Sequence, residues 1–90
     1  MGSKSRKKVE RLPEKLLQIR LGLALSQTQM KEKLELDSTY KAIGRYENGE
    51  HEPSLPTLLR YAKLAGISTD ILIDDTKDLP QKFLKAKKSS

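Results

Sequence analysis

Residues 25–49, LSQTQMKEKLELDSTYKAIGRYENG, contain the signals of two short helices joined by a link. Ser26 and Gln29 have the spacing of a capping box. In this motif the N-cap hydroxyl accepts the main-chain N–H of the residue three positions later, and the side chain of that residue accepts the main-chain N–H of the N-cap residue. Met30 and Leu34 follow at the spacing of one helix face. This pattern predicts a helix that begins after Ser26 and ends at about Leu34.

The second helix of this stretch is expected at about residues 38–48. Asp37 and Ser38 are both N-cap candidates, because short polar side chains accept hydrogen bonds from the first N–H groups of a helix. Ile43 would lie on its inner face. Gly49 is typical of the residue that follows a helix C-terminus.

Helical signals continue on both sides of this stretch. Apolar residues at helical spacing follow Pro13, and Ser54 and Ser68 are N-cap candidates for two later helices. A strand-like alternation of apolar and polar residues is absent. We therefore expect a compact all-α fold of five helices, with a possible short sixth helix after Pro80. The expected divisions are a flexible basic arm at 1–11, a helical domain at 12–75 and a C-terminal tail at 76–90.

Charge is distributed unevenly along the chain. The net charge is +6, but residues 1–11 carry +4, residues 82–90 carry another +4 and residues 12–81 carry −2. Basic segments beside a DNA-binding domain can neutralise phosphates and release counterions. The alternative is a pair of solvated tails that keep the protein soluble.

Several classes of protein are excluded by composition. The 90 residues include no cysteine, so disulfides, thiol chemistry and zinc fingers are ruled out. No apolar run approaches the length of a membrane span, and the sequence predicts a cytoplasmic protein. The one histidine, His51, lies between Glu50 and Glu52 in a predicted loop, where a solvated loop is a simpler interpretation than a metal site. We expect no enzymatic activity, no cofactor and no metal.

A set of residues between 12 and 75 resembles the Cro and phage-repressor family of helix-turn-helix proteins (XRE-like). The set comprises Arg20, Ser26-Gln27, Met30, Leu34, Ile43, Tyr46-Glu47, Gly49, Pro53-Ser54, Leu58 and Ile67-Ser68. The resemblance implies a lambda-repressor-like DNA-binding domain, in which the helix at about 38–48 reads the major groove.

The resemblance also implies roles for individual residues. The residues expected to read bases are Tyr40, Lys41, Arg45 and Thr39. The residues expected to bind phosphates are Gln27, Thr28, Ser38, Asn48 and, in the arm, Lys7 and Lys8. Arg20 and Glu47 are expected to form a partly buried ion pair. Gly44 would let the backbone approach DNA, serve helix packing, or simply be tolerated in the helix at a cost of about 1 kcal/mol.

Three features depart from the family pattern. The span from Leu34 to Ile43 is nine residues, two longer than the usual seven, so the link or the start of the second helix must absorb the difference. Lys31 replaces a small residue, usually alanine, and Glu35 replaces the usual turn glycine. These changes predict a reshaped link and place the register before Ile43 in doubt.

Two functions follow from these observations. The first is a sequence-specific transcriptional regulator, most simply a repressor, that binds a pseudo-palindromic double-stranded DNA site as a homodimer. The second is an antitoxin or adaptor on the same fold, whose main partner is another protein such as a toxin or an antirepressor. Apolar residues expected to remain after the core is filled are the dimer candidates Leu72, Ile73, Leu79, Phe83 and Leu84. The alternative for Phe83 and Leu84 is that they fold back over the first or fifth helix of a monomer.

Overall fold

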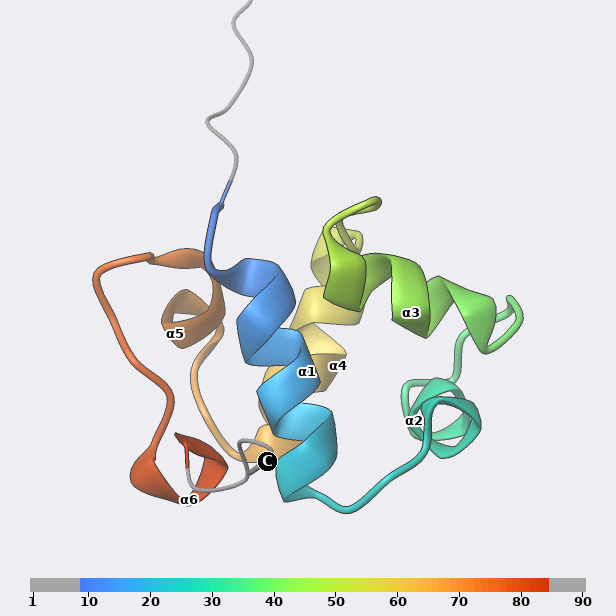
Figure 1. Cartoon of the computed structure of the whole chain (residues 1–90), viewed down its shortest axis with the longest axis horizontal. Coiled ribbons are helices and arrows are strands. Elements are labelled where there is room, and N and C mark those ends of the chain that lie inside the picture. Colours follow the sequence, from blue (N-terminus) through green and yellow to red (C-terminus); the bar gives the residue numbers. More distant parts are fainter. Residues whose placement is uncertain (1–8, 85–90) are drawn as a thin grey trace, which may run out of the picture.

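The computed structural model describes residues 9–84 and contains six α-helices in this range (Figure 1). They are α1 (Leu12–Gly22), α2 (Gln27–Lys33), α3 (Lys41–Asn48), α4 (Leu55–Ala65), α5 (Thr69–Ile73) and α6 (Gln81–Leu84). The described residues contain no strand, so the all-α prediction is confirmed. The count is six rather than five, because the short helix considered for the C-terminal tail forms as α6.

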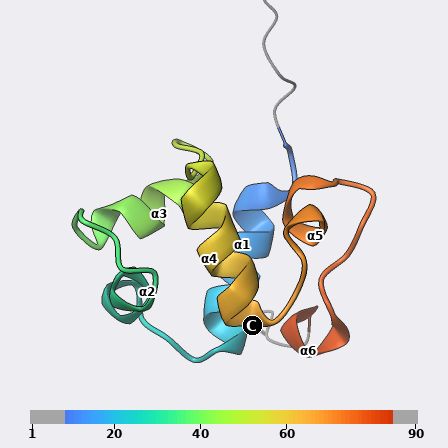
Figure 2. The same cartoon turned by 180° about the vertical axis from the view of Figure 1, so that it is seen from behind.

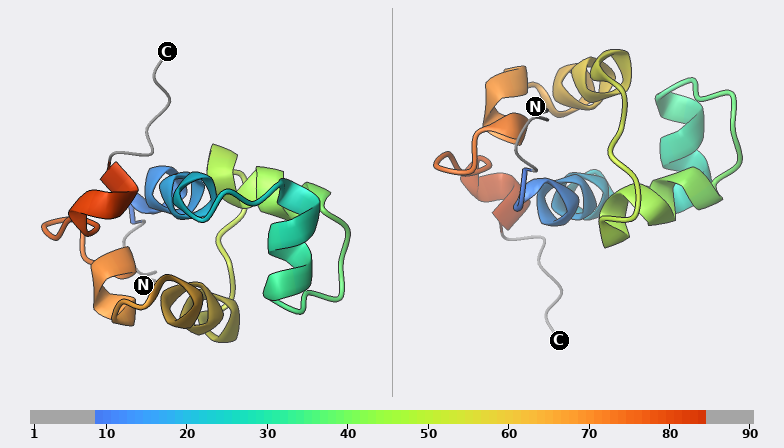
Figure 3. Two further views of the ribbon diagram at one scale, coloured as in Figure 1. Left: turned by 90° about the horizontal axis from the view of Figure 1, so that it is seen from below. Right: turned by 90° about the horizontal axis from the view of Figure 1, so that it is seen from above.

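Helices α1 and α4 lie at the centre of the molecule. Helices α2 and α3 lie together on one side of them, and α5 and α6 lie on the other (Figures 1 and 2). The views from below and above show the same separation (Figure 3). This arrangement places the helix-turn-helix stretch at one end of the molecule, with α3 packed against α1.

The core draws apolar residues from all six helices and from the link before α6. Its buried members are Leu12, Leu16, Ile19, Met30, Leu34, Ile43, Leu58, Tyr61, Ala62, Ala65, Leu72, Leu79 and Phe83. Burial of these side chains from water is the main stabilising contribution for a domain of this size. No helix among the described residues is long and apolar enough to cross a membrane.

The expectation that the C-terminal apolar residues are left over from the core is wrong. Leu72, Leu79 and Phe83 are 0%, 3% and 1% exposed within the single chain, so none of them is available at the surface as a dimer contact. A Cβ added at Gly22 would lie 2.6 Å from Cδ1 of Phe83, so this glycine lets the ring lie directly on α1. Leu84 is half-buried, and only Ile73 of the predicted set remains exposed. Phe83 therefore folds back over α1 within the single chain, which is the alternative to a dimer contact.

The predicted caps of α2 and α4 are confirmed. The Gln29 N–H donates to Ser26 Oγ (3.0 Å), and the Ser26 N–H donates to Gln29 Oε1 (2.8 Å). Ser54 Oγ accepts the N–H of Thr57 (3.3 Å) at the start of α4. Gly49 follows α3 in a left-handed conformation with φ +81°, which glycine adopts without a steric penalty.

The predicted start of α3 is wrong. The helix begins at Lys41 rather than near residue 38, and neither Asp37 nor Ser38 is its N-cap. Thr39 Oγ1 instead accepts the N–H of Lys41 (3.2 Å), and Tyr40 occupies the N-cap position. The two additional residues are therefore accommodated in an irregular link between α2 and α3.

The link leaves α2 through a left-handed residue. Glu35 has φ +57° at the position where the family usually has glycine. A side chain in this conformation costs about 1–2 kcal/mol, which glycine avoids. Arg60 on α4 supports the turn, because its Nη1 donates to the main-chain oxygen of Leu34 (2.9 Å).

We predict that Glu35→Gly leaves the free energy of unfolding unchanged or raises it by up to about 1 kcal/mol, because relief of the left-handed strain offsets the greater chain entropy of glycine. Glu32→Gly is the matched control, since Glu32 is an exposed residue within α2. The control should lose about 1 kcal/mol. Urea denaturation measures both. An equal loss in the two variants would contradict the role assigned to the left-handed turn.

Candidate nucleic-acid interface

Helix α3 has one buried face and one exposed face. Ile43 is fully buried in the core. Lys41, Arg45 and Asn48 are exposed, and their spacing of four and three residues aligns them along one side of the helix. The helix therefore presents two cations and an amide to the surroundings while its apolar side holds it to the domain.

The remaining predicted base readers lie at or before the N-terminus of α3. Tyr40 is 47% exposed at the N-cap, next to the exposed stripe. Thr39 is exposed in the link rather than on the helix, and so is Ser38, which was predicted to bind phosphate. The hydroxyl of Thr39 already accepts a hydrogen bond from the main chain. Of the four predicted readers, Lys41 and Arg45 are thus on the outer face of the helix itself.

Arg20 on α1 and Glu47 on α3 form the ion pair that was predicted between them. Arg20 Nε lies 2.7 Å from Glu47 Oε2, and Nη2 lies 3.0 Å from Oε1. The side chains are only 14% and 5% exposed. Arg20 Nη1 also donates to the main-chain oxygen of Leu25 (3.0 Å), just before α2. This two-bond geometry holds α3 in one orientation relative to α1.

Gln27, the first residue of α2, joins the same pair. Its Nε2 donates to Glu47 Oε1 at 3.3 Å. An amide group has a second N–H and a carbonyl oxygen, so this bond is compatible with a further contact to phosphate. Nothing in the sequence signalled the contact with Glu47. Thr28, the next residue, is exposed.

Gly44 faces α2 rather than open solvent. A Cβ added there would lie 3.5 Å from Gln27 Nε2, which is an ordinary van der Waals distance. The packing of α3 against α2 therefore does not require glycine at this position, and of the three roles considered the geometry fits plain tolerance of glycine in the helix.

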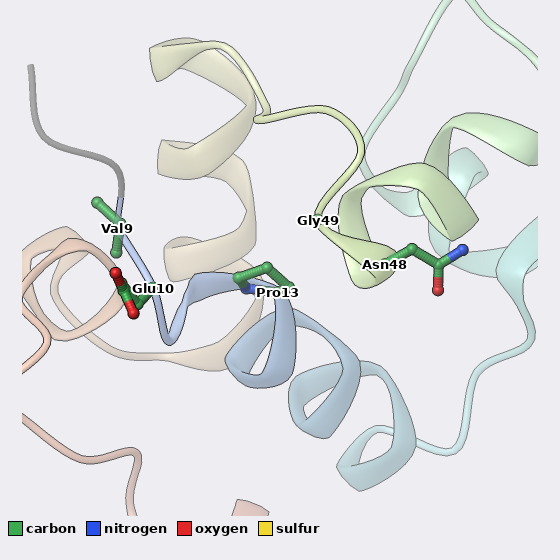
Figure 4. Close-up of a pocket in the computed structure, with 5 residues that line it drawn as sticks. All are labelled: Val9, Glu10, Pro13, Asn48 and Gly49. Carbon is green, nitrogen blue, oxygen red and sulfur yellow. The ribbon is translucent and has the colours of Figure 1, made fainter. Parts of the chain in front are cut away.

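A groove of about 320 Å³ lies at the C-terminal end of α3 (Figure 4). It is lined by Val9, Glu10, Pro13, Asn48 and Gly49. Figure 4 shows the amide of Asn48 directed away from Val9, Glu10 and Pro13. The described chain thus begins beside the end of the helix that carries the exposed stripe. Lys7 and Lys8, predicted to bind phosphates, lie outside the described residues.

We expect Arg20→Gln and Glu47→Gln each to lower the free energy of unfolding by about 3–5 kcal/mol, because each leaves the other charge buried without its partner. The double variant should lose less than the sum of the single losses. Chemical denaturation of the four proteins gives the coupling energy between the two side chains.

The matched control is the exposed pair of Lys77 and Asp70, whose side chains are 45% and 52% exposed and whose charged atoms are 2.9 Å apart. Its coupling should be at most about 1 kcal/mol, because solvent screens the pair. Equal coupling energies for the two pairs would contradict the structural role given to Arg20 and Glu47.

Comparisons with known proteins agree with this geometry. The family model described as helix-turn-helix matches residues 16–72, more than half of the chain. The chain is 36% identical over 63 residues to the "SPbeta prophage-derived uncharacterized HTH-type transcriptional regulator YonR" of Bacillus subtilis (strain 168). That alignment covers 70% of this chain and 56% of the relative, so the chain spans little more than half of the relative's length. No solved structure matches. The chain belongs to the helix-turn-helix family of the XRE type, a family of DNA-binding transcriptional regulators.

Proposed function

We propose that this protein is a sequence-specific regulator, most simply a cytoplasmic repressor, that reads the major groove of double-stranded DNA with α3 and catalyses no reaction. The observation that carries the proposal is the exposed stripe of Lys41, Arg45 and Asn48. The stripe lies on a helix whose other side is anchored by Ile43 and Glu47. A rigidly held cationic helix is the arrangement that fits a major groove.

Each exposed group has a partner of suitable chemistry on DNA. Arg45 and Lys41 can donate to O6 and N7 of guanine, which are the acceptors that guanine presents in the major groove. Tyr40 can pack on a thymine methyl or bond a phosphate. Asn48 at the C-terminal end of α3, and Gln27 with the first N–H groups of α2, can bind the phosphate backbone.

A module whose main partner is a protein does not require these cations on the outer face of α3. The stripe therefore favours DNA over the antitoxin or adaptor alternative. A toxin or an antirepressor, as an additional partner, would bind another surface.

We further propose that two copies bind one pseudo-palindromic site. A single α3 reads about one half-site, and two modules related by a two-fold axis read two half-sites about one helical turn apart. Because Leu72, Leu79 and Phe83 are in the core, a variant that tests pairing must alter a surface residue. Ile73, 43% exposed on α5, is suitable.

Selection from random duplex DNA should enrich one motif, and Arg45→Ala or Lys41→Ala should relax a specific base position by about 1–3 kcal/mol of discrimination. Asn48→Ala should weaken all sequences by a similar factor, because a phosphate contact carries no base information. Lys63→Ala is the matched control, since Lys63 is exposed on α4, outside the α2–α3 surface.

Failure to enrich any motif would refute the regulator and leave the protein-partner alternative. An unchanged motif with Arg45→Ala would show that this side chain does not read a base. Binding that loses affinity equally with Lys63→Ala would indicate non-specific attraction to a basic protein.

The number of protein chains bound to one duplex tests the proposed dimer. Sedimentation with the selected DNA should give two protein chains per duplex, and Ile73→Glu should reduce cooperative pairing while leaving the melting temperature nearly unchanged, because its side chain is exposed. A single chain bound to a site without internal symmetry would rule out the dimer.

A further inference from the structure

The start of α1 is held by a carboxylate from the opposite end of the chain. Asp75 Oδ2 accepts the main-chain N–H of Glu10 and Oδ1 accepts that of Arg11, both at 3.0 Å. Arg11 is the N-cap of α1, and its side chain makes no capping bond. Asp75 therefore accepts main-chain hydrogen bonds at the start of α1, as an N-cap side chain does, although it is distant in sequence. Donation from Arg11 and Glu10 lowers the pKa of Asp75, which keeps the carboxylate ionised at neutral pH.

The side chain of Arg11 strengthens the same attachment. Its Nη1 donates to the main-chain oxygen of Asp75 (2.8 Å), and its Nη2 pairs with Asp78 Oδ1 (2.6 Å). Lys15, one turn further along α1, is buried and donates to two main-chain oxygens of the neighbouring segment, those of Ile71 (2.7 Å) and Asp74 (3.1 Å). The segment after α5 is thereby fastened to the first turns of α1.

This attachment determines where the chain enters the domain. Val9 and Glu10 line the groove that Asn48 and Gly49 also line, at the C-terminal end of α3 (Figure 4). The sequence before Val9 contains four basic residues and no acidic residue: Lys4, Arg6, Lys7 and Lys8. A cationic segment thus precedes a fixed point beside the stripe proposed to bind DNA.

We infer that Asp75, assisted by Asp78, is a positioning residue for DNA binding. Its bonds to Glu10 and Arg11 fix residues 9–11 beside the C-terminal end of α3, so that the basic sequence preceding Val9 starts from a point next to the proposed DNA surface. Because residues 9–11 are already fixed in the free protein, binding to DNA does not incur the cost of ordering them. The inference rests on the proposed function and adds to it a role for residues far from α3 in sequence.

The sign of the effect separates positioning from simple electrostatics. Asp75→Asn removes a negative charge, so general attraction to DNA should increase. The positioning role predicts the opposite. Affinity at low salt should fall by about three- to tenfold, and the slope of log K against log salt should become shallower by about one or two as phosphate contacts are lost.

The matched control is Asp70→Asn. Asp70 is exposed, pairs with Lys77, and makes the same charge change when replaced, but its bonds involve no residue at the start of α1. The control should bind DNA as tightly as the unaltered protein or slightly more tightly. A fall in affinity of the same size in both variants would overturn the inference.

The decisive comparison repeats the measurement in a protein whose four basic residues before Val9 are replaced, K4Q/R6Q/K7Q/K8Q. If Asp75 acts through those residues, Asp75→Asn has no further effect on affinity or salt slope in this background. An equal fall in both backgrounds would show that Asp75 serves only the fold. Normal binding by K4Q/R6Q/K7Q/K8Q itself would also overturn the inference, because the basic segment would then make no contact.

Asp78→Asn provides a second variant that keeps the main-chain bonds of Asp75, so it retains the fold even if Asp75→Asn does not. It should shift affinity in the same direction by a smaller factor, and an unchanged or raised affinity would count against the inference. Selection of a motif by the unaltered protein is scored separately. A selected motif with no response to Asp75→Asn or Asp78→Asn removes the positioning role but leaves the proposed function intact.

Discussion

The pairing of Arg20 with Glu47 is the constraint on which the rest of the DNA-binding surface depends. Glu47 is 5% exposed, and a carboxylate so buried is stable only with a charged partner and further donors. Arg20 from α1 and Gln27 from α2 supply these bonds. One carboxylate on α3 therefore fixes three helices relative to one another, and the orientation of Lys41 and Arg45 follows from it.

The parts of the fold that depend on neighbouring residues could be predicted from sequence. The capping box of Ser26 and Gln29 and the glycine after α3 are decided by hydrogen bonds that span about four residues, so the sequence contains the whole interaction. The pairing of Arg20 with Glu47 required more, because these residues are far apart in sequence. It was predicted through the resemblance to a family, and the observed contact agrees with it.

Features that depend on tertiary packing could not be predicted in the same way. Asp37 and Ser38 both have the short polar side chains that favour an N-cap. The longer link nevertheless places the start of α3 at Lys41. The apolar side chain of Phe83 gave no indication whether it meets Gly22 or a second chain, since both bury it equally well. The bonds of Gln27 to Glu47 and of Asp75 to the start of α1 join distant segments without a sequence signature.

Chemical probing of the selected duplex with dimethyl sulfate shows whether the outer face of α3 reads guanine in the major groove. The reagent methylates guanine at N7 in the major groove and adenine at N3 in the minor groove. Bound protein should protect guanine N7 in each half-site, and one protected guanine should become reactive again with Arg45→Ala. Protection confined to adenine N3, with every guanine N7 still reactive, would contradict the reading of guanine by α3.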